Sequence, residues 1–236
     1  RSSDLLSAET VARNIDKVNN EIATVCAKSG RAVASVSLIA VSKRIPQNLV
    51  MDAYHHGQKY FGENRVQDAL SRLENMTEPD IQWHFIGNIQ KNKVRKVVGK
   101  FDLLHAVDSI KLAERISSVA TEMNLVQPVL LEVNASVEEQ KHGISPEEVV
   151  EAVKLCSTLP GIELQGLMTM ARFGATEEEL HTTFAKLRQL RDESVTAISH
   201  DLPHLSMGMS GDYSIAIEEG ATLIRVGTSI FGKREK

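Results

Sequence analysis

A lysine directly after a short apolar run is the residue of this sequence best placed for covalent chemistry. Residues 38–41 read Leu-Ile-Ala-Val, which is typical of a fully buried parallel strand, and Ser42 and Lys43 follow. Pro46 then suits the first turn of a helix, where its missing N–H is not needed. We therefore expect Lys43 at the carboxyl end of a strand, where a desolvated amine has a lowered pKa and becomes nucleophilic. The alternative is an ordinary solvated charge.

Two loops near the end of the chain are rich in small residues and hydroxyl groups, and they predict a phosphate site. They span residues 206–211 (Ser-Met-Gly-Met-Ser-Gly) and 227–229 (Gly-Thr-Ser). Glycine lets backbone N–H groups approach an anion closely, and Ser210 and Thr228 can donate hydroxyl hydrogens. In α/β barrels a phosphate often binds to the loops after strands seven and eight. The alternative is helix capping by Ser210 or Asp212, with a tight turn at Gly227.

An amine and a phosphate site on one rim would suit a phosphorylated aldehyde held as a Schiff base. Arg225 is predicted inside the last strand, and a buried guanidinium needs a partner. A carboxylate such as Glu63 or Glu132 could pair with it. Alternatively, Arg225 could donate to the ring nitrogen of pyridoxal 5'-phosphate (PLP), which would keep that nitrogen unprotonated and make the ring a poorer electron sink.

The periodicity of the chain predicts the frame that positions these residues. Apolar residues recur at helical spacing from Val11 to Val25, which predicts an extra N-terminal helix within residues 1–30 that plugs or flanks the rest. Eight short apolar segments then alternate with seven or eight helical segments. These segments are 38–41, 60–64, 82–86, 103–107, 128–133, 164–168, 204–207 and 223–226.

This alternation predicts an α/β fold, a single (β/α)₈ TIM barrel over residues 37–234 within one domain of residues 1–236. The alternative is an open doubly wound sheet. That fold would need a glycine-rich turn after the first strand, and Ser42-Lys43-Arg44 is not one.

Composition limits the functional classes. The chain has 236 residues, of which 42% are hydrophobic and 25% charged, and its formal net charge of -4 argues against a general nucleic-acid binder. No apolar run approaches the roughly 18 residues of a membrane span. Two cysteines without zinc spacing predict no metal site and favour a reducing compartment, the cytoplasm. Organellar targeting stays open, because the first three residues could be a trimmed end.

Several motifs, in a fixed order, resemble those of the pyridoxal phosphate homeostasis proteins, the YggS/PROSC family. The motifs are Lys43, 61–64 (Phe-Gly-Glu-Asn), 83–87 (Trp-His-Phe-Ile-Gly), 206–210 and 225–228 (Arg-Val-Gly-Thr). The resemblance runs from about residue 37 to 234 and includes Val133, Asn134, Glu138, Glu139, Lys141, Gly143 and 166–168. The chain departs from the family pattern at Arg44-Ile45, where Thr-Lys is frequent, and at Arg65, where tyrosine is frequent.

The resemblance implies a fold type III PLP barrel similar to the N-terminal domain of alanine racemase. It implies that Lys43 holds PLP as a Schiff base and that Arg225 faces the pyridine nitrogen. It assigns the phosphate to Ser210, Gly227 and Thr228, with backbone help from Met207 and Gly211. It also places Asn64 and His84 beside the cofactor. The alternative for His84 is a histidine satisfied within the barrel.

The sequence favours a PLP carrier that serves intracellular PLP homeostasis and delivery over a PLP-dependent amino-acid racemase. Racemisation needs acid–base groups on both faces of the reacting carbon, and in racemases of this fold a separate domain of a partner subunit supplies the second one. The predicted barrel leaves no room for that domain, and the three tyrosines, Tyr54, Tyr60 and Tyr213, fall within the barrel. A class I aldolase-like enzyme for phosphorylated sugars is a third possibility, with Glu63 or Glu132 as general base.

A basic segment follows Asn88 on a predicted helix. Its cations are Lys91, Lys93, Arg95, Lys96 and Lys100. The acidic total favours a solvated helix face over a nucleic-acid site. An apo-enzyme that receives PLP could also dock there. Without the second racemase domain we expect a monomer, and a dimer mass in light scattering would contradict this.

Overall fold

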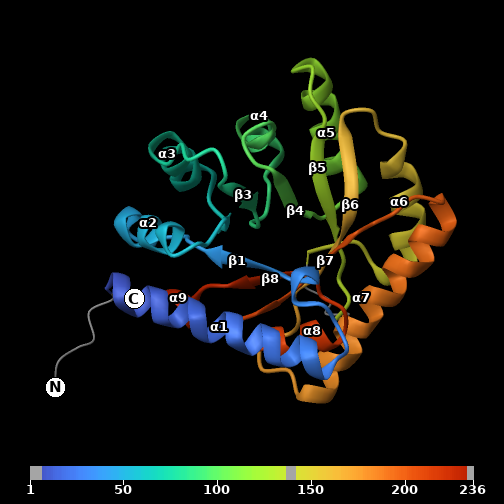
Figure 1. Ribbon diagram of the computed structural model, residues 1–236. Helices are drawn as coiled ribbons and strands as arrows, with labels where there is room; N and C mark the ends of the chain where they lie inside the picture. The colour runs from blue at the N-terminus through green and yellow to red at the C-terminus, as the bar shows by residue number, and fades with distance from the viewer. Residues whose placement is uncertain (1–6, 137–141, 233–236) are drawn as a thin grey trace.

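Eight parallel strands close into a barrel in the computed structural model of the chain, which describes residues 7–136 and 142–232 (Figure 1). Each strand pairs with the next one along the chain, and β8 pairs with β1 to close the ring. The strands are β1 (Ser37–Val41), β2 (Tyr60–Glu63), β3 (Gln82–Phe85), β4 (Leu103–Val107), β5 (Gln127–Glu132), β6 (Ile162–Met168), β7 (His204–Met209) and β8 (Leu223–Val226). The predicted (β/α)₈ barrel is confirmed.

The predicted strands agree with these bounds to within two residues at each end. Parts of the predicted boundaries and motifs lie outside the described residues. They are residues 1–6, Glu138, Glu139 and Lys141 of the loop after β5, and residues 233 and 234 at the predicted end of the barrel.

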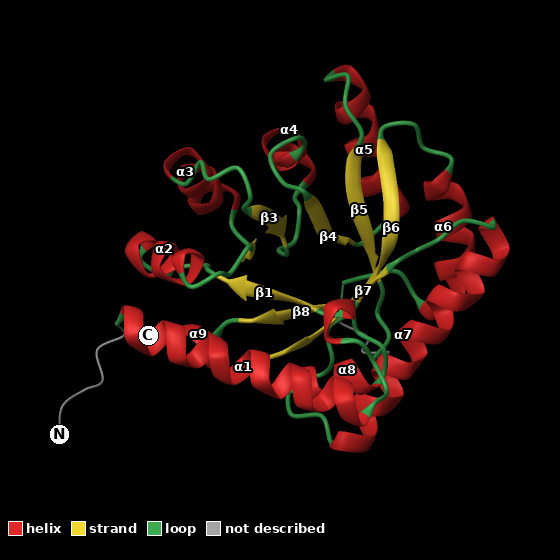
Figure 2. Ribbon diagram, in the orientation of Figure 1, coloured by secondary structure: helices red, strands yellow, loops and turns green. Residues whose placement is uncertain are grey.

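Helices cover the outside of the barrel, as Figure 2 shows. They are α1 (Ala8–Lys28), α2 (Gln47–His55), α3 (Val66–Asn75), α4 (Val94–Val97), α5 (Ile110–Glu122), α6 (Val149–Ser157), α7 (Glu177–Ile198), α8 (Tyr213–Glu218) and α9 (Thr228–Phe231). Short 3₁₀ helices are η1 (Val33–Ser35), η2 (Lys91–Lys93) and η3 (Pro146–Glu148). Among the described helices, none combines the length and apolar character that crossing a membrane requires.

The N-terminal helix α1 flanks the barrel and does not plug it (Figure 1). It packs against α2, α8 and α9. Its buried face consists of Val11, Ile15, Val18, Ile22, Val25 and Cys26. At its start, Asn14 Nδ2 donates to the Ile230 carbonyl oxygen at 2.8 Å. Because α9 is a single turn, α1 covers a side of the barrel that a longer final helix would otherwise cover.

Side-chain alternation divides the core into two apolar clusters. Leu38 and Ala40 of β1 point outward and pack in the large cluster between the strands and the helices. Ile39, between them, joins the cluster inside the barrel with Leu103, Ala106, Leu130, Met168 and Leu223. Arg225 has the same strand parity as Leu223, so its side chain also points into the barrel, nearer the carboxyl ends of the strands.

The basic segment after Asn88 is less helical than predicted. It forms η2 and the single turn α4, and the chain then becomes extended at Val98 and left-handed at Gly99, where φ is +73°. A glycine with positive φ ends a helix readily, because it has no Cβ to clash with the preceding turn.

Candidate functional site

A tight turn carries Lys43 at the carboxyl end of β1, as the sequence predicts. The backbone N–H of Ile45 donates to the Ser42 carbonyl oxygen at 3.0 Å, so Lys43 and Arg44 form the centre of the turn. Lys43 is half-buried. Arg44 has a φ of +60°, a left-handed conformation that costs a residue with a Cβ roughly 1–2 kcal/mol. Surrounding contacts must hold this turn in place.

A buried ion pair provides those contacts. Glu63, the last residue of β2, is completely buried and lies 2.9 Å from Arg72 Nε of α3. Its Oε1 also accepts from the Ser42 hydroxyl at 2.7 Å. Arg72 Nη2 donates to the carbonyl oxygens of Ile45, at 2.7 Å, and Ser42, at 3.3 Å. The pair therefore clamps both ends of the turn that carries Lys43.

This arrangement corrects two expectations for Glu63. Glu63 is paired with Arg72 and not with Arg225, because its side chain points out of the barrel toward α3. For the same reason it is not available inside the barrel as a general base for an aldolase-like reaction. Burial raises the pKa of this carboxyl, and the hydrogen bond from Ser42 and the charge of Arg72 oppose that increase.

Arg225 is buried inside the barrel and linked to β6 and β7. Its guanidinium donates to the Ser206 hydroxyl and, at 3.0 Å, to the Thr169 carbonyl oxygen. Burial lowers its pKa to about 10, while the carboxylates of Asp212 and Glu132 oppose this shift. Arg225 therefore stays protonated at neutral pH. The sequence predicts Glu63 or Glu132 as the partner of Arg225. Of these two, Glu132 raises the pKa of Arg225 through its negative charge.

A chain of hydrogen bonds runs from Arg225 deeper into the barrel. Ser206 Oγ lies 2.8 Å from His105 Nδ1, and His105 Nε2 lies 2.9 Å from His84 Nδ1. Arginine can only donate, so Ser206 accepts from Arg225 and gives its own hydrogen to His105. His105 then carries its proton on Nε2 and donates it to His84. The guanidinium of Arg225 thus determines which atom donates in each of these hydrogen bonds.

His84 is satisfied within the barrel, the alternative named for it above. Its ring also packs edge-on against Tyr60, with centroids 5.8 Å apart. Burial lowers the pKa of His84 to about 3 and that of His105 well below its usual value. Both rings are neutral at pH 7. A direct contact between His84 and a cofactor stays a prediction, because Ser206 and His105 separate it from Arg225 along the chain.

These histidines predict a loss of stability in mild acid. In the unfolded chain they have pKa values near 6.5 and bind protons, whereas in the barrel they do not. The free energy of unfolding therefore falls as the pH drops below about 6.5, by about 1.4 kcal/mol per pH unit for each histidine. Urea unfolding should show a loss of about 4 kcal/mol from this pair between pH 7 and pH 5.

Two histidine variants test the assignment. His84→Gln should remove about half of this pH dependence. The exposed His200→Gln should leave it unchanged. A free energy of unfolding that is flat between pH 7 and pH 5 in the parent protein would show that the buried rings are not held neutral.

The two phosphate loops lie side by side, as predicted. Ser210 Oγ accepts from the backbone N–H of Gly227 at 3.2 Å and from that of Ser229 at 3.3 Å. Two backbone donors therefore converge on one oxygen, which is the arrangement that binds an anion. Thr228 lies between these donors and is exposed. The sequence places Ser229 in the loop but does not single it out as a donor.

The other predicted phosphate residues differ in their surroundings. Gly211 is exposed, next to Ser210. Met207 lies within β7, three residues before Ser210, and its side chain packs in the helix-facing cluster. Gly208 has a φ of +97°, and a Cβ there would lie 2.7 Å from the Ala216 Cβ, so only glycine lets α8 pack this close. Backbone roles for Met207 and Gly211 stay predictions.

Asn64 follows β2 and holds an unsatisfied polar atom. Its Oδ1 is buried, without a hydrogen-bond partner among the described residues. Buried oxygens are nearly always satisfied, so this one points to a ligand or to water. Gly87, two residues after β3, lies against the backbone of Asn64, and a Cβ there would lie 2.3 Å from the Asn64 carbonyl oxygen.

Gly87→Ala should therefore displace Asn64 and destabilise the barrel. The overlap is with backbone atoms, which cannot rotate away, so we expect a loss of about 2–3 kcal/mol in urea unfolding. Gly211→Ala is the matched control, because no atom lies within 4 Å of a Cβ at that position. Its effect should stay within about 0.5 kcal/mol. Equal stabilities for the two variants would contradict the close contact.

Comparisons with known proteins place the chain in a family. The alanine racemase N-terminal domain family matches residues 14–235. A pyridoxal phosphate homeostasis protein from Aquifex aeolicus is 42% identical over 221 residues, which cover 94% of this chain and 97% of the relative. The human protein with that name is 37% identical over 232 residues, which cover 92% of this chain and 84% of the relative. The chain belongs to the pyridoxal phosphate homeostasis protein family.

Solved structures agree with membership of the pyridoxal phosphate homeostasis family. PipY of Synechococcus elongatus with PLP bound is 36% identical to this chain, with a TM-score of 0.83, and the match covers 94% of this chain and all of PipY. Alanine racemase from Corynebacterium glutamicum has a TM-score of 0.73 at 15% identity, and the match covers 96% of this chain and 61% of the racemase. The second likeness shows the fold alone. The resemblance inferred from the sequence motifs is confirmed.

Proposed function

We propose that this chain binds PLP as a Schiff base with Lys43 and serves PLP homeostasis by holding and delivering the cofactor. The observation that carries this proposal is the pair of backbone donors at Ser210, at the same end of the barrel as the Lys43 turn. A phosphate there and an amine at the end of β1 would hold the two ends of one small molecule. The family name and the PLP-bound structure of PipY support the choice of ligand.

The described residues fit this cofactor. When bound, PLP supplies an aldehyde carbon and a conjugated ring that can accept electrons. The Lys43 amine would attack the aldehyde carbon, and condensation would release one water. Arg225 would present its cation to the ring nitrogen, with its orientation set by Ser206 and Thr169. Asn64 has a buried oxygen still to be satisfied.

A carrier role is favoured over racemisation because two of the three tyrosine hydroxyls are engaged in hydrogen bonds to carboxylates. Tyr213 donates to Glu21 of α1 at 2.5 Å, and Tyr54 donates to Asp80 at 2.7 Å. These hydrogen bonds raise the pKa of Tyr54 and add to the effect of burial on the pKa of Tyr213. Tyr60 packs on His84 within the barrel. None of the three is placed as a second base opposite Lys43.

Titration of the purified protein with PLP tests this proposal. We expect a saturable absorbance band at about 420 nm, which borohydride should remove while attaching the cofactor covalently. Peptide mass mapping should then place the attached group on Lys43. Incubation of the loaded protein with L-alanine should yield no D-alanine. A missing band would contradict PLP binding, whereas D-alanine formed by the parent protein would contradict the carrier role.

A further inference from the structure

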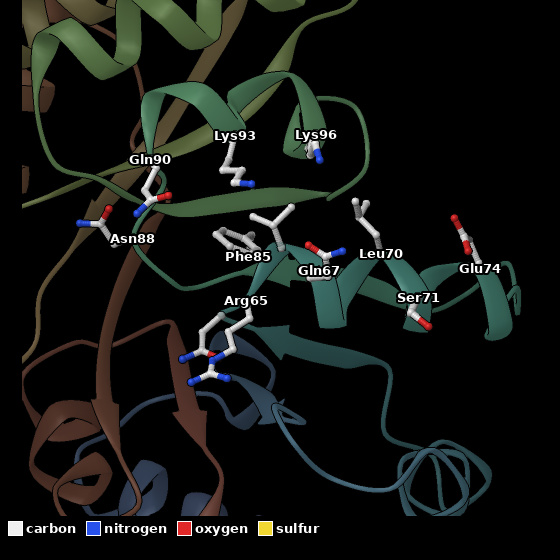
Figure 3. Close-up of a pocket in the computed structure, with 12 residues that line it drawn as sticks. Arg65, Gln67, Leu70, Ser71, Glu74, Phe85, Asn88, Gln90, Lys93 and Lys96 are labelled. Carbon is white, nitrogen blue, oxygen red and sulfur yellow. The ribbon is translucent and has the colours of Figure 1, made fainter.

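A cationic groove opens between α3 and the segment η2–α4, at the ends of β2 and β3 (Figure 3). Its volume is about 530 Å³. The cations that line it are Arg65, Lys93 and Lys96, and the carboxylate is Glu74. In Figure 3, Lys93 and Lys96 face α3 across the groove, and Arg65 points away from α4. The groove therefore carries a net positive charge on an acidic protein.

These three cations have no carboxylate partner in the part of the chain that the structure describes. Within the described residues, no carboxylate forms an ion pair with Arg65, Lys93 or Lys96. By contrast, Arg95 on the same turn as Lys96 pairs with Glu122 of α5. Arg95 is thus paired within the molecule, whereas Lys93 and Lys96, which face the groove, are available to a partner.

The groove reaches the site through Asn64, which lines it. Asn64 follows Glu63, whose carboxylate accepts from Ser42 next to Lys43. A partner seated in the groove would therefore lie at the carboxyl ends of β2 and β3, next to β1, the strand that leads to Lys43. The groove also exceeds the size of one phosphate group, and its cations come from separate elements. This spread suits several carboxylates on a chain better than one small anion.

We propose that this groove is the docking surface for an acidic segment of the protein that accepts PLP. The proposal rests on the delivery function proposed above and adds the place of contact. Complementary charge would steer the acceptor to the groove and orient it toward Lys43. A nucleic acid fits less well, because its extended phosphate backbone would meet a chain with a net charge of -4.

Transfer kinetics test the docking surface. PLP-loaded protein is mixed with an apo-aminotransferase that has an acidic active-site entrance, and recovered aminotransferase activity reports transfer. Direct transfer predicts a rate that rises with acceptor concentration. Lys93→Glu combined with Lys96→Glu should lower this second-order rate constant at least tenfold at low salt, and the difference should shrink as salt is added.

The matched control is Lys91→Glu combined with Lys100→Glu. Both of these lysines are exposed, neither lines the groove, and the total charge changes by the same amount. We expect the control to change the rate less than twofold, with equal PLP absorbance in all three proteins. Equal slowing by both pairs, or a rate independent of acceptor concentration, would overturn the docking proposal. Lack of a PLP band in the parent protein would instead refute the proposed function.

A hexaglutamate peptide probes the groove without PLP. Titration calorimetry should show saturable binding to the parent protein and to the control pair, and loss of binding in the Lys93→Glu, Lys96→Glu protein. Equal binding to all three would contradict the groove as an acidic-segment site. Light scattering tests whether a second copy of this chain occupies the groove, because it measures the mass of the protein in solution. A parent dimer that the Lys93→Glu, Lys96→Glu protein converts to a monomer would assign the groove to a second copy of this chain.

Discussion

Replacing Lys43 with alanine is expected to abolish covalent PLP attachment while the barrel stays folded. The amine is the only part of the side chain that can condense with the aldehyde, and alanine lacks it. The band at about 420 nm, which borohydride fixes in the parent protein, should disappear and leave at most the spectrum of the free aldehyde. The affinity for PLP should fall at least tenfold because the covalent bond is lost. Some affinity should remain, since the phosphate loops and Arg225 would still bind the rest of the molecule. Absorbance titration and mass spectrometry measure both effects.

Two controls separate chemistry from folding in this experiment. Lys91→Ala removes an exposed lysine and should leave the band unchanged. Urea unfolding of Lys43→Ala should stay within about 1 kcal/mol of the parent, because Lys43 is only half-buried. If borohydride still attached PLP to Lys43→Ala with the parent's stoichiometry, the attachment would have to be assigned to another lysine.

Arg72→Met is expected to be the most destabilising single change near the site. It leaves the Glu63 carboxylate fully buried with no counter-charge, and removing one partner of a buried pair costs about 3–5 kcal/mol. It also removes the donor to the carbonyl oxygens of Ser42 and Ile45. We expect the fraction of this variant that remains folded to bind PLP more weakly, because the turn that carries Lys43 loses its clamp.

Arg95→Met provides the comparison, since Arg95 and Glu122 form an exposed ion pair. Such pairs contribute about 1 kcal/mol or less, so urea unfolding should change little. Combining Arg72→Met with Glu63→Leu should recover part of the lost stability, because an apolar pair leaves no buried charge. A loss below about 1 kcal/mol for Arg72→Met, or additive losses in the double variant, would contradict the clamp.

The sequence alone determined the barrel and the order of its parts. Leu38 to Val41 are apolar on both faces, as a strand enclosed between helices and a barrel interior must be. Local rules of this kind depend only on neighbouring residues, so they also located the Lys43 turn and the loop from Gly227 to Ser229. The motifs around Asn64 and Arg225 indicated the family for the same reason, because each lies within one short segment.

Only the tertiary structure decided which of these residues meet. Strand parity directs Glu63 outward to Arg72 and Arg225 inward to Ser206, although both are charged residues in or next to buried strands. Ser206 and His105 are 101 positions apart in the chain, so no local pattern predicts their hydrogen bond. The groove between α3 and α4 likewise exists only once the barrel closes. Contacts between distant segments depend on register and closure, which a local pattern does not encode.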